Sequence, residues 1–246
     1  MLVHGIGCHW QMWKPVIAEL TASREVVAVD LPGFGRSAPL PASRPPTVEA
    51  LADALAEFFE EEGIGRPHVV GNSLGGGLAL ELGRSGRARS VTALSPIGFW
   101  NDRERAYAYR IIDGTVRATP RLVPFAAALT ATAPGRTLAF GHMSHRPWRW
   151  PADSARDAFV AAGRAPAFRS TLEAMIGWDA AGGATTVPTT IAWAQHDLLL
   201  IPRQRHRARR RLPDARHVLL ESCGHLPFWD DPQRVAEVVL EGSATR

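Results

Sequence analysis

The sequence predicts an α/β fold in which helices flank a mostly parallel central sheet. Short apolar, β-branched runs alternate with helical stretches, and this alternation is interrupted between Pro96 and about Thr186. The interruption holds amphipathic helical pieces broken by prolines, with no convincing strand. A chain of 246 residues, 46% of them hydrophobic, is long enough for one large core. We therefore expect an α/β core formed by 1–96 and 185–246, and a helical cap or lid over 97–184.

The expected strands are short apolar runs, as is typical of strands buried on both faces of a parallel sheet. In chain order they cover 1–3, 26–29, 66–70, 90–94, 189–194 and 218–220. The first leads into His4-Gly5, the second ends at Asp30, and the third leads into a glycine-rich turn. Parallel neighbours need long crossovers, so the segments between these strands are expected to be helices on the faces of the sheet.

The expected helices carry apolar residues at helical spacing. They cover 13–20, a segment after Thr47, 76–82, the arginine-rich stretch 203–211 and 232–240. Thr47 suits the N-cap position, with Glu49 in the first turn and an apolar face behind it. Asp231 precedes Pro232 and is interpreted as the N-cap of the last helix.

Composition excludes several classes of protein. No apolar run is long enough to cross a bilayer and the N-terminus lacks a signal-like segment, so we expect a cytoplasmic protein with no membrane partner. The two cysteines, Cys8 and Cys223, suit a reducing compartment. The nine histidines show no metal-ligand spacing, so we expect no metal, and nothing in the sequence requires a cofactor.

The net charge of +4 comes almost entirely from arginine, because Lys14 is the only lysine. The densest cluster, 203–211, could bind a polyanion. It has no interleaved aromatics and no nucleic-acid motif accompanies it, so the solvated face of a surface helix is the favoured interpretation. We expect no nucleic-acid partner.

The pentad at 71–75, GNSLG, is the most informative motif. It follows a β-branched strand and precedes a helix-forming run, which is the context of a nucleophile elbow. Such a turn strains the backbone of Ser73 and holds its hydroxyl clear of the sheet, while Gly71 and Gly75 let strand and helix approach. The helix N-terminus offers unpaired N–H groups to a developing anion.

A serine nucleophile needs a base and a group that orients the base. Asp197 and His225 each follow a predicted strand, which places them with Ser73 at the carboxyl edge of the sheet. Asp102, shortly after the strand 90–94, is an alternative partner for the histidine. In this scheme the backbone N–H groups of Ile6 and Leu74 form the oxyanion site.

Other residues near these motifs receive structural interpretations. His4 is taken as a hydrogen-bonded residue beside the oxyanion loop, and Asp30 as a residue that shapes its own loop. Cys8 is taken as a buried, inert thiol. Aromatic side chains at Trp10, Phe99, Trp100 and Phe228 flank the motifs, and they either line an apolar acyl pocket or pack in the core.

Together these motifs resemble the α/β-hydrolase superfamily, over nearly the whole chain. The blocks that carry the resemblance are His4-Gly5-Ile6-Gly7, the loop 30–37, the elbow 71–76, Asp197 and Gly224-His225-Leu226-Pro227. The branch it most resembles is that of esterases and carbon–carbon-bond hydrolases with a helical cap. Serine at 73 argues against the epoxide-hydrolase and haloalkane-dehalogenase branches, which use aspartate there, and the missing further glycines after Gly5 argue against the lipase branch.

The resemblance implies a cofactor-free serine hydrolase that cleaves a small to medium apolar ester or related carbonyl compound through an acyl-enzyme. Two alternatives stay open: hydrolysis of a carbon–carbon bond in a vinylogous diketone, and a ligand-binding or signalling protein whose triad turns over slowly. Fold and triad do not choose among them.

The sequence departs from the family at its start, because relatives usually carry about two strands before the block at His4. Without them the strand from Val26 to Val29 is an exposed apolar edge. We expect either that the natural chain starts upstream of Met1 or that a second copy, in a homodimer, covers this edge.

Overall fold

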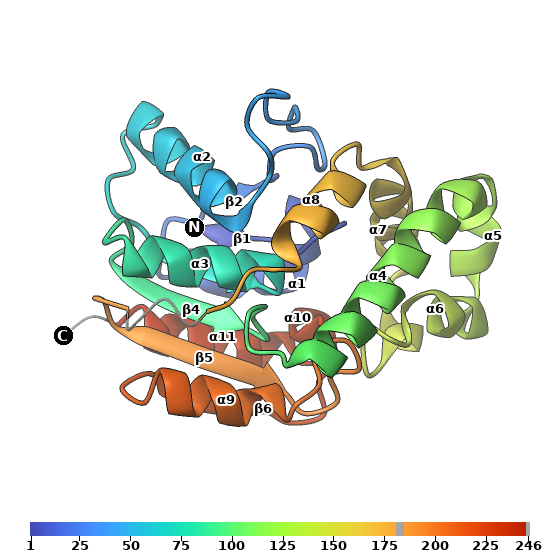
Figure 1. The fold of residues 1–246 in the computed structure, drawn as a ribbon. Helices are drawn as coiled ribbons and strands as arrows, with labels where there is room; N and C mark the ends of the chain where they lie inside the picture. The colour runs from blue at the N-terminus through green and yellow to red at the C-terminus, as the bar shows by residue number, and fades with distance from the viewer. Residues whose placement is uncertain (181–184, 245–246) are drawn as a thin grey trace.

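The computed structural model describes residues 1–180 and 185–244. It shows a six-stranded sheet in the order β2-β1-β3-β4-β5-β6, with every adjacent pair parallel (Figure 1). The strands are β1 (Leu2–Val3), β2 (Ala28–Val29), β3 (His68–Asn72), β4 (Ser90–Leu94), β5 (Thr189–Ala194) and β6 (Arg216–Leu220). The predicted parallel α/β sheet is therefore confirmed. β2 is two residues long, shorter than the predicted run 26–29, and lies at the edge of the sheet.

Each face of the sheet carries its own apolar core, because alternate residues of a strand point to opposite faces. Val3 and Val69 belong to one buried cluster, whereas their neighbours Leu2 and Val70 belong to another. The first cluster includes residues of α2 (Val48–Glu61), α3 (Leu74–Arg84) and α9 (Gln204–Arg211). The second includes residues of α1 (Lys14–Thr21), α10 (Pro227–Asp230) and α11 (Pro232–Gly242). The central strands β3, β4 and β5 are thus buried from both sides.

Local capping agrees with the sequence at two helices. The Thr47 hydroxyl accepts a hydrogen bond from the N–H of Ala50 at 3.1 Å, at the start of α2. The carboxylate of Asp231 accepts one from the N–H of Arg234 at 3.0 Å, at the start of α11. Both predicted N-caps are confirmed.

Among the described residues, the segment between β4 and β5 contains no strand, and its regular elements are helices. They are α4 (Asp102–Leu122), η2 (Val123–Phe125), α5 (Ala126–Ala131), α6 (Ala133–Phe140), η3 (Pro147–Arg149), α7 (Ala152–Arg164) and α8 (Phe168–Met175). These helices lie together on one side of the sheet, on the right in Figure 1. We call the segment 97–184 the helical insert; residues 181–184 of it lie outside the described residues. Its status as a separate domain stays a prediction.

Two arginines of α9 join the core to both ends of the insert. Arg207 pairs with Glu104 of α4 and donates to the carbonyl of Phe99, and Arg211 pairs with Asp179. The arginine-rich helix α9 therefore holds the insert to the core through partly buried ion pairs, in addition to presenting a charged surface. Among the described residues, no helix is both long and apolar enough to span a membrane.

Candidate active site

Ser73 occupies a strained turn between β3 and α3. Its φ of 58° and ψ of −116° lie in a region that side chains other than glycine rarely adopt. The two flanking glycines explain how the turn is built: a Cβ on Gly71 would lie 1.9 Å from the carbonyl oxygen of Gly75, and a Cβ on Gly75 would lie 2.2 Å from the carbonyl oxygen of Val3. Helix and strands therefore pack backbone against backbone here, which leaves the serine side chain directed away from the sheet.

His225 and Asp197 form a buried hydrogen-bonded pair. Nδ1 of His225 lies 2.7 Å from Oδ2 of Asp197, and each residue is only 1% exposed. The other carboxylate oxygen accepts hydrogen bonds from the N–H groups of Leu199 at 2.9 Å and Leu200 at 2.8 Å. These bonds fix the carboxylate, which in turn fixes the ring of the histidine.

Asp102, the alternative partner, lies away from this pair. Its side chain is 90% exposed at the start of α4 and pairs with Arg105 one helical turn later. Of the two aspartates that the sequence offers, the structure brings only Asp197 to His225.

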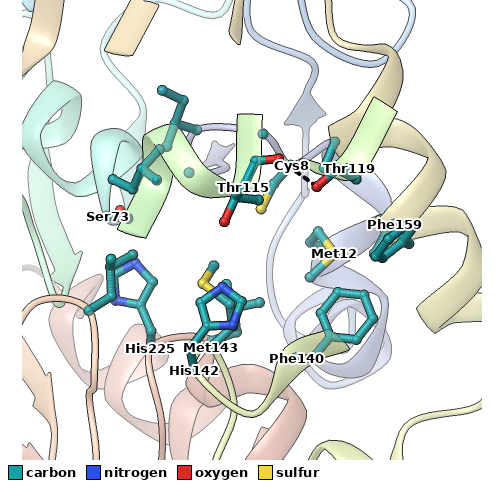
Figure 2. Close-up of a pocket in the computed structure, with 18 of the residues that line it drawn as sticks. Cys8, Met12, Ser73, Thr115, Thr119, Phe140, His142, Met143, Phe159 and His225 are labelled. Atoms are coloured by element: carbon teal, nitrogen blue, oxygen red, sulfur yellow. Dashed lines mark hydrogen bonds between the residues drawn. The ribbon is translucent and has the colours of Figure 1, made fainter. Parts of the chain in front are cut away.

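Ser73 and His225 face the same cavity, and Figure 2 shows the imidazole directly below the serine. The neighbour of the serine helps to hold the histidine: the amide of Asn72 donates to the carbonyls of His225 at 3.0 Å and Leu94 at 3.1 Å. Within the described part of the chain, no hydrogen bond joins the serine hydroxyl to the imidazole. Such bonds commonly tighten only when substrate is bound.

The loop after β1 approaches Ser73 closely. A Cβ on Gly5 would lie 3.1 Å from the Cβ of Ser73, so only glycine fits there without movement. Ile6 follows in this loop and lines the cavity. Among the described residues, neither the N–H of Ile6 nor that of Leu74 donates to another backbone or side-chain atom. Both donors of the expected oxyanion site are thus unpaired.

The residues interpreted as structural are placed accordingly. His4 contacts the carbonyl of Gly5 through Nδ1 at 2.7 Å, and its Nε2 accepts from the N–H of Leu31 at 3.0 Å. Burial lowers its pKa from 6.5 to about 4, so the ring is neutral. Asp30 accepts from the N–H groups of Trp10 and Arg36, which shapes its loop.

The cavity beside Ser73 is narrow and almost entirely apolar. Its volume is about 80 Å³, room for roughly five water-sized groups. Among the described residues that line it, none is Asp, Glu, Lys or Arg. Its principal apolar walls are Met12, Ile112, Phe140, Met143, Phe159 and Phe168. Cys8 also lines it, and burial raises the pKa of that thiol to about 12, so the thiol is protonated and inert.

None of the four aromatic residues considered for the pocket lines this cavity, which corrects that part of the expectation. Phe99 packs edge-on against Trp193, and Phe228 packs on Trp13 at 4.7 Å between ring centroids. Trp100 is buried in the first core cluster, and Trp10 lies in η1 (Trp10–Trp13). Large apolar rings near a sheet edge contribute most by filling the core, and the insert supplies the pocket walls instead.

Three polar residues of the cavity, Thr115 and Thr119 of α4 and His142 of the loop after α6, are not predicted from the sequence. All three lie in the insert, whose packing over Ser73 cannot be read from local periodicity. Asp230, a buried carboxylate next to the N-cap Asp231, is not predicted either. The only signal for His142 is that it is a histidine near apolar helical pieces.

Comparisons with known proteins agree with this geometry. Residues 1–238 match the model of the alpha/beta hydrolase family. The chain is 30% identical over 250 residues to a pimeloyl-[acyl-carrier protein] methyl ester esterase of Aromatoleum aromaticum, covering 97% of this chain and 95% of that protein. It is 30% identical over 206 residues to the epoxide hydrolase EphH of Mycobacterium tuberculosis, covering 77% and 91%.

Among solved structures, an esterase of Thermogutta terrifontis superposes with a TM-score of 0.72 at 24% identity, covering 98% of this chain and 87% of that one. The chain therefore shares its fold with a class of enzymes that have a parallel sheet and a strand-to-helix elbow. The chain belongs to the alpha/beta hydrolase family, and its enzymatic class is that of a hydrolase.

Proposed function

We propose that this protein is a serine hydrolase that cleaves carboxylic esters through an acyl-enzyme. The observation that carries the proposal is the arrangement around one cavity of a strained serine, a histidine held by a buried aspartate, and two unpaired backbone N–H groups. These are the parts that acyl transfer to a serine requires.

In the proposed mechanism His225 takes the proton of the Ser73 hydroxyl as the oxygen attacks the ester carbonyl carbon. Asp197 stabilises the imidazolium that forms and keeps Nε2 directed at the serine. The N–H groups of Ile6 and Leu74 stabilise the negative oxygen of the tetrahedral intermediate. The intermediate collapses to the acyl-enzyme, and the alcohol leaves with the proton from His225. Water, deprotonated by the same histidine, then releases the acid.

The lining of the cavity supports an ester over an epoxide. The nucleophile position holds a serine hydroxyl, and no carboxylate lines the cavity among the described residues. A neutral, apolar pocket with donors for an oxyanion suits a carbonyl carbon, which becomes negatively charged at oxygen when it is attacked. Of the two relatives named above, the methyl ester esterase therefore points to the more fitting class of substrate.

The nucleophile is tested with a fluorophosphonate probe followed by intact-mass analysis. We expect the wild-type protein to gain one phosphonyl group and Ser73→Ala to gain none. Ser170→Ala, which removes a serine of α8 outside the cavity, is the matched control and should label like the wild type. Equal labelling of the wild type and Ser73→Ala would refute the assignment.

The bond cleaved is tested by steady-state kinetics with p-nitrophenyl esters of increasing acyl length and with a vinylogous diketone. We expect turnover of the short and medium esters and a decline for chains too long for the cavity. Turnover of the diketone alone would move the activity to carbon–carbon bonds. Absence of any turnover, despite labelling of Ser73, would favour the ligand-binding alternative.

A further inference from the structure

The cavity carries polar groups in its middle as well as at the Ser73 end, whereas its far end is apolar. Figure 2 shows the hydroxyl of Thr115 above and the imidazole of His142 below, on opposite walls of the same space. On one side of this pair lie Ser73 and His225, and on the other lie Phe140 and Phe159. A chain that extends from the serine into the cavity therefore passes between Thr115 and His142 before it reaches the apolar end.

His142 has an imidazole with hydrogen-bonding capacity to spare. Within the described part of the chain, no hydrogen bond occupies either of its ring nitrogens. Burial lowers its pKa from 6.5, and the nearby His225 lowers it further, so the ring is neutral near pH 7. A neutral imidazole offers one N–H donor and one acceptor nitrogen. The proposed mechanism uses neither.

The hydroxyl of Thr115 is already used as a hydrogen-bond donor but can still act as an acceptor. It donates its proton to the carbonyl of Ile111 at 3.0 Å, one turn earlier in α4. Its oxygen keeps lone pairs that face the cavity and can accept a hydrogen bond. The wall at Thr115 can thus accept a hydrogen bond, and the opposite wall at His142 can donate one.

We propose that Thr115 and His142 form a subsite for a hydroxyl group on the arm of the ester that enters the cavity. The hydroxyl oxygen accepts from the N–H of His142, and its proton is donated to Thr115. This inference rests on the proposed function, since it specifies which esters that site takes.

The subsite ranks substrates by chemistry. A hydroxyl makes both hydrogen bonds, a ketone oxygen can only accept from His142, and a methylene makes neither and leaves the imidazole of His142 without a partner. Each net hydrogen bond contributes on the order of 1 kcal/mol, and an unpaired buried polar group costs a similar amount. We expect the order hydroxyl, then ketone, then methylene, with about 5-fold in affinity for each step.

The test uses Ser73→Ala, which binds esters without consuming them, and isothermal titration calorimetry. The probes are methyl hexanoate with its 3-, 4- and 5-hydroxy and oxo derivatives, and hexyl acetate with the same changes in its alcohol arm. We expect one position in one arm to show the hydroxyl preference, about 25-fold over the hydrocarbon.

Added substitutions identify the groups. In the Ser73→Ala background, Thr115→Val should reduce the hydroxyl compound to the affinity of the ketone. His142→Leu should abolish the preference for the ketone over the hydrocarbon and leave the hydroxyl compound only the about 5-fold preference that Thr115 provides. His142→Gln, which can still donate, should restore part of the lost preference. Thr137→Val is the matched control, because Thr137 donates to the carbonyl of Ala133 in the same way but lies outside the cavity.

Equal affinity for hydroxy, oxo and plain esters at every position would overturn the subsite, as would a preference for the ketone over the hydrocarbon that survives His142→Leu. Turnover is measured separately with wild-type protein and methyl hexanoate. Turnover without a hydroxyl preference leaves the serine hydrolase in place and removes the subsite. A hydroxyl preference in binding, without turnover of esters or labelling of Ser73, would support the subsite and remove the serine hydrolase.

Discussion

Asp230 holds the backbone of Gly224, the residue before His225: its Oδ2 accepts the Gly224 N–H at 2.8 Å. The same carboxylate accepts from the hydroxyl of Ser144 at 2.7 Å and from the N–H groups of His145 and Arg146. One buried aspartate therefore joins the histidine loop of the core to the loop of the insert that carries His142.

Replacing Asp230 by Asn should destabilise the fold and disturb the site together. An amide has one oxygen in place of two and turns an N–H₂ toward groups that are donors themselves, so one or more of them lose their acceptor. We expect a loss of about 2–3 kcal/mol in the free energy of unfolding by urea. Misplacing His225 should also lower kcat, by up to about 100-fold.

Asp231→Asn is the control for this change. Asp231 caps α11, and Asn caps helices as well as Asp does, so stability and kcat should stay close to those of the wild type. Equal effects of the two substitutions would show that Asp230 has no special part in holding the site.

The orienting acid is tested by two matched substitutions. Asp197→Asn should reduce kcat by about 10³- to 10⁴-fold in an ester assay, because the amide cannot stabilise the imidazolium or fix its tautomer. Asp102→Asn should leave kcat unchanged, since this side chain is exposed and pairs only with Arg105 among the described residues. The opposite result would assign the role to Asp102.

The elbow should tolerate no side chain at Gly75. The Cβ of Gly75→Ala would lie 2.2 Å from the carbonyl oxygen of Val3 and 2.7 Å from that of His4, and both belong to backbone that the sheet holds. We expect this variant to be insoluble or unfolded, as judged by circular dichroism.

Gly114→Ala should have the opposite effect. Gly114 lies within α4, and none of the described residues outside its own helix turn comes within 4 Å of the place that a methyl group would take. The substitution should therefore raise stability by about 0.5–1 kcal/mol. The pair separates steric exclusion from a general sensitivity to loss of glycine.

Stability should fall in acid partly through His4. Its pKa is about 4 in the folded protein and 6.5 when unperturbed, so between these values the unfolded chain binds more protons. The contribution is complete above pH 6.5 and is lost as the pH falls toward 4, by about 3 kcal/mol.

Urea unfolding of the wild type and of His4→Gln across this pH range isolates the contribution of His4 to stability. The variant should be less stable near pH 7 and should lose less stability on acidification. The histidines at 68, 142 and 145 shift in the same direction, but they contribute to both proteins and cancel in the difference. Parallel profiles would show that His4 does not titrate in this way.

The sequence predicts the sheet and the elbow well because both depend on local pattern. Buried strands such as β4 and β5 are short apolar runs, and Thr47 and Asp231 occupy caps that neighbouring residues define. Asp230 escapes such reasoning because its partner Ser144 lies 86 residues away in the chain. Its neighbour Asp231 is predictable because a proline follows it.

The pocket escapes prediction for a related reason. Its walls come from insert helices whose apolar faces look alike in sequence whether they face Ser73 or a neighbouring helix. Phe99 illustrates the ambiguity: it lies five residues after β4, yet it is buried against Trp193. Only tertiary packing distinguishes a wall from a core position.

β4 and β5 are adjacent in the sheet, although the whole insert separates them in the chain. The entropy of closing a loop grows only slowly with its length, by about 0.6 kcal/mol for each doubling. Different inserts could therefore be exchanged between the same two strands at little thermodynamic cost, if they keep partners for Arg207 and Asp230. In this architecture, substrate selectivity can change with the insert while the catalytic residues of the core stay the same.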